Sequence, residues 1–410
     1  MANNFQVYRG QNDCSFERGV MEKRRWLIAC LIAVACSSEL PAPDHVAQYR
    51  AAAVERRNGV YPFVYDRDGH PLSLNPDFQP VAALFASRRA GIHERVTTTL
   101  DSNVQRAALV ALGDLHASLV AIDPRTNEIL AIATTSPDPL QRQYEPGSVI
   151  KVLTLLAALT NHVDVNSLFP YDCKGSLDID GRHFGDWHPG GHGVLPDVDE
   201  ALAESCNVAF ADIGLKIGLD RLRAFHHRAG FDGAAHLGLF AVPLGKTVGE
   251  IFNHFETGFY SIGLAHESVT TLHLAMIASM LANRGVWSTP RLVRDRRSFL
   301  GETRSVPQSK SEKIAPREAV ERVIAAMQAV VTRPKGTGRR AQVDGVSLAL
   351  KTGTAGARER GYDGLMVGFA PADHPKVAFA LIAENAGAAE FAAAKVAHDF
   401  VHGLRASGHL

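Results

Sequence analysis

The sequence has no excess of charge of either sign. Its 410 residues include 43 Lys and Arg and 43 Asp and Glu, which gives a net charge of zero. Domains that bind nucleic acid usually carry a clear excess of Lys and Arg, so we expect no nucleic-acid partner. The basic tract at residues 333–340 has glycine and threonine between its charges, and we interpret it as a solvated loop rather than a polyanion site.

The chain is also poor in long hydrophobic runs. The apolar run at residues 26–36 is 11 residues long, whereas a membrane-spanning helix needs about 20. A basic stretch at 21–25 precedes it, and this order is typical of an export leader. We therefore predict a leader over residues 1–38, with translation starting at Met21 and a signal or anchor at 23–36. Cleavage, a lipid anchor at Cys36 and an uncleaved anchor all stay open.

Cysteine is scarce, with five in the chain. Three lie within the expected leader, which leaves Cys173 and Cys206. An exported protein with two cysteines can form one disulfide, but spacing does not show whether this pair is bonded or free. A nearby Gly/Pro-rich stretch carries His183, His188 and His192. Because glycines and prolines offer no rigid frame for a metal, we interpret this stretch as a solvent loop and predict no metal or other cofactor.

One buried helix organises the rest of the sequence. Pro146 and Gly147 precede a run that is apolar on every side up to Leu159, which predicts a helix from about Ser148 inside the core. Ser148 and Lys151 are its polar residues in the first turn and share one face. Burial disfavours a charged lysine. A partly neutral Lys151 would therefore act as a base that activates Ser148 as a nucleophile.

Two further motifs follow this pair in a fixed order. Ser205-Cys206-Asn207 comes next, and then Lys351-Thr352-Gly353-Thr354. Ser-x-x-Lys, Ser-x-Asn and Lys-Thr-Gly in this order form the signature of the penicillin-recognising acyl-serine enzymes. A second Ser-x-Asn at residues 73–75 precedes Ser148, so the order excludes it.

Patterning along the chain predicts an α+β fold with an antiparallel sheet flanked by helices around the central buried helix. We divide the sequence into the leader, a short N-terminal module at 39–95 and a catalytic domain at 96–405. Within the module we expect a helix at 40–58, a hairpin at 59–72 and an irregular connector at 73–95. Strands are expected at 117–123, 129–133, 346–354, 365–369 and 377–382, and a small hairpin at 173–184. Helices are expected at 104–115, 197–217, 319–331 and 388–404. The helix at 197–217 should have a break near Ser205. A further long helix is expected after Ser261, ending at about residue 285.

With these motifs, the chain resembles the transpeptidase domain of class B penicillin-binding proteins from about residue 97 to residue 385. The landmarks are Glu145-Pro146-Gly147-Ser148, the two motifs above, Ser261-Ile262-Gly263 and Val367-Gly368-Phe369. The N-terminal module is shorter than the pedestal usual in class B proteins, and Leu365-Met366 replaces an aromatic pair. With the expected leader, the resemblance predicts export across the bacterial inner membrane, with the protein periplasmic or membrane-tethered by its N-terminal segment.

The resemblance also implies roles for the motif residues. Ser148 would attack a D-Ala-D-Ala stem peptide of peptidoglycan, and Lys151 would take its proton. Ser205 would relay a proton to the leaving amine, and Asn207 would orient the substrate amide and hold Lys151. Lys351 would attract the substrate carboxylate with help from the Thr352 and Thr354 hydroxyls, and Gly353 lies between them in the strand. The backbone N–H groups of Ser148 and Thr354 would form the oxyanion hole.

Other activities use the same residues. The leading expectation is a D,D-transpeptidase that crosslinks stem peptides and binds β-lactams. A membrane glycan polymerase is its expected protein partner. A D,D-carboxypeptidase, a serine β-lactamase and a non-catalytic β-lactam-binding partner of a wall-synthesis complex stay open. A β-lactamase needs a base for deacylation, and the nearest pattern is Glu250-Ile251-Phe252-Asn253. We interpret it as the start of a structural helix.

Overall fold

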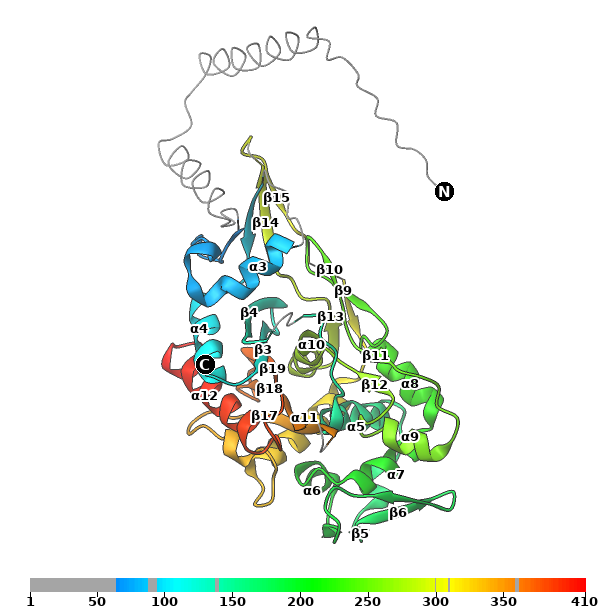
Figure 1. Ribbon diagram of the computed structural model, residues 1–410. Helices are drawn as coiled ribbons and strands as arrows, with labels where there is room; N and C mark the ends of the chain where they lie inside the picture. Colours follow the sequence, from blue (N-terminus) through cyan, green and yellow to red (C-terminus); the bar gives the residue numbers. More distant parts are fainter. Residues whose placement is uncertain (1–63, 88–93, 137–139, 299, 309, 358–360) are drawn as a thin grey trace, which may run out of the picture. The chain divides into compact units, whose positions relative to one another are not determined.

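The computed structural model describes residues 64–87, 94–136, 140–298, 300–308, 310–357 and 361–410 (Figure 1). The expected leader with Cys36, the helix at 40–58 and residues 59–63 of the hairpin at 59–72 lie outside these residues. Within the described part of the chain, no helix is both long enough and apolar enough to cross a membrane.

A five-stranded antiparallel sheet forms the centre of the described residues, in the order β17-β18-β19-β3-β4. Its strands are β3 (Ala117–Asp123), β4 (Glu128–Thr134), β17 (Ala349–Ala357), β18 (Gly361–Ala370) and β19 (Val377–Ala383). Every residue of β3, β4 and β19 is buried. Both faces of these strands are covered, which is why they read as continuous apolar runs rather than as alternating patterns.

Helices cover the two faces of this sheet. α4 (Ser102–Leu112) and α12 (Ala392–Ala406) pack together on one side, and α10 (Thr271–Ala282) lies on the other (Figure 1). All twelve residues of α10 are buried. The predicted central helix is α5 (Lys151–Thr160), whose first eight residues are buried. The predicted α+β class with an antiparallel sheet is confirmed.

The remaining helices pack around α5 or close to it. They are α6 (Val198–Ala203), α7 (Asn207–Ile217), α8 (Leu219–Arg228), α9 (His254–Tyr260) and α11 (Arg317–Thr332), with the 3₁₀ turns η4 (Val165–Leu168) and η5 (Arg339–Ala341). The predicted break near Ser205 is confirmed, because α6 and α7 are separate helices joined by a turn at that residue.

Five small two-stranded sheets occur among the helices and loops of the described residues, outside the central sheet. The predicted hairpin at 173–184 is β6 (Ser176–Ile179) with β7 (Arg182–Gly185), while β5 (Tyr171–Cys173) pairs instead with β8 (Gly193–Leu195). The other pairs are β9 (Ala234–His236) with β10 (Ala241–Pro243), β11 (Lys246–Thr247) with β12 (Glu267–Ser268), and β13 (Val286–Ser288) with β16 (Ser311–Lys313).

A four-stranded sheet joins early and late parts of the chain. It consists of β1 (Val64–Tyr65), β2 (Glu94–Thr98), β14 (Val293–Ser298) and β15 (Thr303–Ser305). The chain turns at Asp68-Gly69 as predicted, but β1 pairs in parallel with β2. The connector expected to be irregular contains η1 (Leu72–Leu74), η2 (Pro76–Phe78) and α3 (Gln79–Ser87), so that prediction was wrong. Asn75 supplies the cap of this segment by accepting the Asp77 N–H.

Candidate active site

Ser148 and Lys151 lie at the start of the central helix, in a tighter turn than predicted. The chain enters α5 through the 3₁₀ turn η3 (Gly147–Ile150), so the helix does not begin as a regular α-turn at Ser148. In a 3₁₀ turn the side chains at i and i+3 eclipse one another. The Ser148 and Lys151 side chains therefore leave the turn on the same side, one above the other. Ser148 is half-buried and Lys151 is fully buried.

The Lys151 ammonium is held by the Ser-x-Asn turn. Its Nζ donates to the Ser205 carbonyl at 2.6 Å and to Asn207 Oδ1 at 2.6 Å, with Ser205 Oγ at 3.4 Å. Burial lowers the pKa of Lys151 to about 8, although the nearby Asp186 carboxylate opposes this shift. Near neutral pH a useful fraction of Lys151 is therefore the neutral amine that a general base requires.

The turn itself has an unusual backbone. Ser205 has φ of 59°, a left-handed conformation that residues other than glycine seldom adopt. Hydrogen bonds on the following residues hold it in place. Cys206 caps α7 by accepting the Ala209 N–H at 3.3 Å, and Asp186 Oδ2 accepts the N–H groups of Asn207 and Val208 at 2.8 and 3.1 Å.

Lys351 contacts the same serine as Lys151. It lies in β17, is fully buried, and donates from Nζ to Ser205 Oγ at 2.9 Å and to the Thr352 carbonyl at 2.7 Å. Burial, followed by repulsion from Lys151, lowers the pKa of Lys351 well below its usual range. The Ser205 hydroxyl thus lies between two buried lysines.

Two glycines allow β17 to lie directly against η3. A Cβ on Gly147 would lie 2.7 Å from the Thr354 carbonyl oxygen, and Gly147 has φ of 56°. A Cβ on Gly353 would lie 2.8 Å from a methyl group of Val149. Both contacts are shorter than van der Waals packing permits, so glycine at these positions keeps Ser148 beside the Lys-Thr-Gly strand.

A cavity of about 370 Å³ brings most of the predicted residues together. Its lining includes Ser148, Ser205, Asn207, Thr352, Gly353 and Thr354. Lys151 and Lys351 are buried behind this wall and contact it through Ser205. The lining also includes residues that the motifs did not indicate, among them Trp187, Thr337, Tyr362 and Glu390. They come from loops and strand ends far apart in sequence, so no local pattern marks them.

The tract at 333–340 is only partly the solvated loop that we predicted, because Lys335, Arg339 and Arg340 are exposed but Arg333 and Thr337 are half-buried. Arg333 pairs with Asp197 at 2.9 Å and with Glu200 at 2.5 Å at the start of α6, and its side chain is 28% exposed. Thr337 Oγ1 lies 2.6 Å from Thr352 Oγ1, and the Thr337 N–H donates to the Ala203 carbonyl. The segment therefore links the Ser-x-Asn turn to the Lys-Thr-Gly strand, and two of its charges, Arg333 and Lys335, pair with acidic residues.

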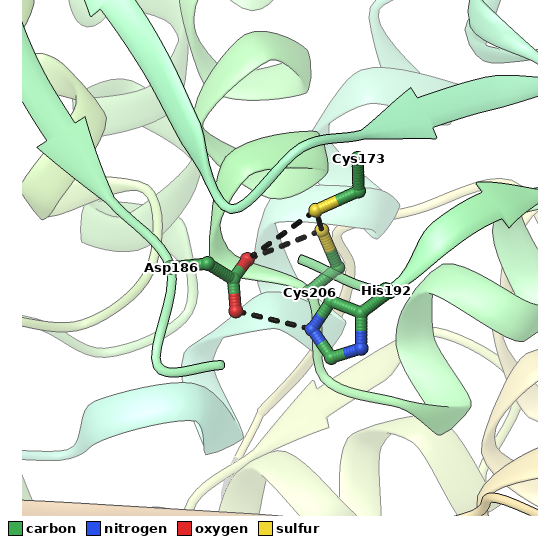
Figure 2. Close-up of side chains that lie close together, drawn as sticks. All are labelled: Cys173, Asp186, His192 and Cys206. Carbon is green, nitrogen blue, oxygen red and sulfur yellow. Dashed lines mark hydrogen bonds and ion pairs between the residues drawn. The ribbon is translucent and has the colours of Figure 1, made fainter. Parts of the chain in front are cut away.

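The histidine-containing loop is likewise only partly exposed. His183 and His188 are exposed as expected, but the His192 side chain is 3% exposed and contacts Asp186 at 3.0 Å and Glu204 at 2.9 Å. The solvent-loop interpretation was therefore wrong for His192. Cys173 and Cys206 are both buried free thiols, with their sulfurs 3.4 Å apart (Figure 2).

This geometry agrees with what comparisons with known proteins find. A family model, the penicillin binding protein transpeptidase domain, matches residues 117–402. The chain belongs to the penicillin-binding protein transpeptidase family. The matched range contains all three motifs and all five strands of the central sheet, so the resemblance seen in the sequence is confirmed.

Relatives of this penicillin-binding protein domain are found in several bacteria. The chain is 30% identical over 350 residues to peptidoglycan D,D-transpeptidase PbpA of Mycolicibacterium smegmatis, covering 71% of this chain and 67% of that protein. It is 30% identical over 341 residues to peptidoglycan D,D-transpeptidase MrdA of Acinetobacter baumannii, covering 70% of this chain but 50% of that protein.

Solved structures of the family share the fold. Penicillin-binding protein 3 of Mycobacterium tuberculosis superposes with a TM-score of 0.74 at 20% identity, covering 85% of this chain and 96% of that one. A ceftriaxone acyl-enzyme complex of penicillin-binding protein A from the same organism gives 0.69 at 23% identity, covering 85% and 87%. At these identities the likeness shows the fold alone, and residue roles are argued below from the geometry.

Proposed function

We propose that this chain is a serine-type peptidoglycan D,D-transpeptidase that crosslinks stem peptides through an acyl-enzyme on Ser148. The observation that carries the proposal is the convergence of three motifs on one cavity. Ser148, Ser205, Asn207 and Thr352 through Thr354 line it, and both motif lysines contact the Ser205 hydroxyl. A nucleophile, a base and a second proton carrier thus occur together, as acyl transfer requires.

In the acylation step, Ser148 Oγ attacks the carbonyl carbon of the D-Ala-D-Ala bond while Lys151 takes the hydroxyl proton. The N–H groups of Ser148 and Thr354 stabilise the oxyanion. The carbon–nitrogen bond then breaks, and Ser205 passes a proton to the leaving amine. Lys351 Nζ at 2.9 Å from Ser205 Oγ is placed to resupply that proton, so Ser205 relays between the two lysines.

The terminal carboxylate of the substrate would bind to the hydroxyls on β17. Thr352 and its neighbour Thr337 share a hydrogen bond. Thr354 Oγ1 accepts the Ala389 N–H, which leaves its own proton free to donate. Lys351 is fully buried, so we infer that it acts on the carboxylate through Thr352 rather than by direct exposure at the cavity wall.

The acyl-enzyme would then react with an amine of a second stem peptide. Transfer to water instead would make the protein a carboxypeptidase, and fast hydrolysis of a penicillin adduct would make it a β-lactamase. Glu250 is exposed and does not line the described cavity. Asn253 caps α9 by accepting the Glu256 N–H at 2.9 Å, as expected of a structural helix start. β-Lactams, which mimic the same substrate, would acylate Ser148 and deacylate slowly.

The expected leader places this chemistry outside the cytoplasm. We propose that residues 23–36 direct export across the bacterial inner membrane, with the domain periplasmic or tethered there, and that a membrane glycan polymerase supplies the strands to be crosslinked. A chain beginning at Ser37 should then purify without detergent, whereas aggregation of that chain alone would assign the apolar run to the fold.

The decisive experiment follows the adduct and the acceptor separately. The purified chain is acylated with penicillin, freed of excess drug and followed by intact mass, and a D-Ala-D-Ala peptide is then supplied with a D-amino acid acceptor. A stable adduct with exchange of the terminal D-alanine supports the transpeptidase. Release of D-alanine without exchange identifies a carboxypeptidase. Loss of the adduct within seconds identifies a β-lactamase. A stable adduct with neither release nor exchange of D-alanine identifies a non-catalytic β-lactam-binding protein, and the absence of any adduct contradicts the assignment of Ser148 as the nucleophile.

A further inference from the structure

Four potential metal ligands gather beneath the Ser-x-Asn turn. Cys173 comes from the end of β5, Asp186 and His192 from the segment between β7 and β8, and Cys206 from the turn before α7 (Figure 2). One ligand atom from each side chain lies within 4.8 Å of all the others. The segments are up to 33 residues apart in sequence, so the fold alone assembles this set.

The spacing of these atoms suits a small tetrahedral ion. The two sulfurs are 3.4 Å apart, and Asp186 Oδ2 is 3.3 Å from Cys206 Sγ and 3.9 Å from Cys173 Sγ. His192 Nε2 is 3.0 Å from Asp186 Oδ1. Tetrahedral zinc with metal–sulfur bonds near 2.3 Å and metal–nitrogen or metal–oxygen bonds near 2.0 Å separates its ligand atoms by about 3.3 to 3.8 Å. Shifts of a few tenths of an ångström in these side chains would bring the four ligand atoms to those separations.

The residues behind these side chains support the same interpretation. His192 points Nε2 toward the cluster, and its other nitrogen, Nδ1, lies 2.9 Å from Glu204 Oε2. Histidines that bind metals usually donate their second N–H to a carboxylate in this way. Asp186 is oriented in turn by the backbone N–H groups of Asn207 and Val208.

We propose that Cys173, Asp186, His192 and Cys206 bind one structural Zn²⁺ ion. Two sulfur donors with imidazole and carboxylate favour zinc over calcium or magnesium, which prefer all-oxygen ligands. Four protein ligands complete a tetrahedron and leave no open position, so the ion would be structural rather than catalytic. On binding, each thiol loses its proton to solvent, and no oxidation or reduction takes place.

Such an ion would fix the catalytic turn. Cys206 lies between Ser205, which contacts both lysines, and Asn207, which accepts from Lys151. Ser205 also has a left-handed backbone that needs support from its neighbours. A zinc ion on Cys206 and Asp186 would hold this turn from below, so the four ligands are positioning residues for Ser205 and Asn207.

A disulfide is the competing state of the same two thiols. Joining the Cys173 and Cys206 sulfurs would need an external oxidant and would shorten their separation from 3.4 Å to about 2.05 Å. It would remove both thiolate ligands from the cluster. The disulfide and the zinc site therefore exclude one another, and mass spectrometry separates them.

The test uses the full chain without a polyhistidine tag, purified from zinc-containing medium in buffers free of chelator and oxidant. Cys14, Cys30 and Cys36 are replaced by serine in a background variant, so that other thiols do not contribute. Elemental analysis should give one zinc per chain in the wild-type protein and in the background variant. His192→Ala and Cys173→Ser should lose most of the zinc, whereas His183→Ala, an exposed histidine on β7, should retain it.

Cobalt replacement tests the ligand set directly. Co²⁺ added to the metal-free background variant should give a near-ultraviolet thiolate charge-transfer band that weakens in Cys173→Ser. Removal of zinc should lower the melting temperature by roughly 5 °C or more, as loss of a tight ligand does. Removal of zinc should also slow acylation by penicillin. Among these measurements, only the acylation rate rests on the proposed function.

Three results would overturn the zinc site. The wild-type chain could fail to bind stoichiometric zinc after reconstitution with thiols reduced. The freshly purified chain could be metal-free and lighter by the two hydrogen atoms that are lost when a Cys173–Cys206 disulfide forms. His192→Ala could bind zinc as tightly as the wild type. Each is measured without any enzymatic assay, so a failure of the metal site and a failure of the proposed function are distinguishable.

Discussion

At the scale of single residues, the Ser205 hydroxyl is the point where the site's two lysines meet. Lys351 Nζ is 2.9 Å from it and Lys151 Nζ is 3.4 Å from it. Two buried ammonium groups so close to one oxygen repel each other, and neither is well solvated. The arrangement favours a state in which one of the two lysines is neutral. When Lys151 is the neutral one, its amine can accept the Ser148 proton.

Ser148→Ala should abolish covalent labelling by a fluorescent penicillin, because no other hydroxyl occupies the eclipsed position above Lys151. Labelling is measured by in-gel fluorescence and intact mass, with an unchanged melting temperature as the check on folding. Ser73→Ala is the control, since Ser73 lies in η1 in a second Ser-x-Asn sequence and outside the cavity lining. Full labelling of Ser148→Ala would assign the nucleophile elsewhere.

The acylation rate should rise with pH as Lys151 loses its proton. Burial lowers the pKa of Lys151 to about 8, so the neutral base is a minority at pH 6, increases through pH 8 and reaches a plateau above it. Stopped-flow acylation between pH 6 and 9.5 measures this profile. Lys151→Ala should lower the acylation rate by roughly 10²- to 10⁴-fold and should remove its increase with pH. A flat profile in the wild type would show that another group takes the proton.

At the scale of elements, the segment 333–340 acts as a strap between two parts of the site. Its Arg333 end is fixed to the start of α6, and Thr337 bonds to both Ala203 and Thr352. The Ser-x-Asn turn and the Lys-Thr-Gly strand belong to different layers of the fold. The strap is therefore one of the contacts that keep them at a constant separation.

Arg333→Ala should weaken this connection. It removes the partner of Asp197 and Glu200, and we expect a loss of about 1 to 2 kcal/mol in the free energy of unfolding, since the pairs are only partly shielded from solvent. Penicillin acylation should slow as well. Urea unfolding and stopped flow measure the two effects. Arg339→Ala in the same segment, whose guanidinium donates to the Pro334 carbonyl, should change neither strongly; an equal effect would argue against the strap.

At the scale of the whole described domain, stability rests on the sheet packed between helices. Phe379 in β19 is fully buried and meets Phe400 of α12 edge to face, with ring centroids 5.4 Å apart. This contact joins the central strand of the sheet to its C-terminal helix. It lies on the side of the sheet away from α10, so it reports on the core rather than on catalysis.

Phe379→Ala should destabilise the domain by about 3 to 5 kcal/mol, because it leaves a cavity between β19 and α12. Phe252→Ala, at a side chain that is 77% exposed, should change stability by less than about 0.5 kcal/mol. Urea denaturation of both variants gives the comparison. Equal stability of Phe379→Ala and wild type would mean that α12 is not packed on the sheet in solution.

The sequence by itself determined the parts that depend on local pattern. The strands at 117–123 and 377–382, the hairpin turn at Asp180-Gly181 and the break near Ser205 were all predictable, because turn residues and apolar periodicity act over a few neighbours. The motif residues were identified in the same way, since their spacing and order are properties of the chain. The helix α3 within the connector was missed although Phe78, Val81 and Phe85 recur at helical spacing and are buried; the helix is short, with nine residues.

Only the tertiary structure decided which of these residues meet and what surrounds them. Nothing in the local sequence shows that His192 is buried against Asp186 and Glu204, or that Arg333 pairs with α6. The two cysteines were open to a disulfide from the sequence, and the fold brings them beside Asp186 and His192. Burial and partner choice depend on segments far apart in the chain, and their proximity is set by the packing of sheet and helices rather than by any one stretch.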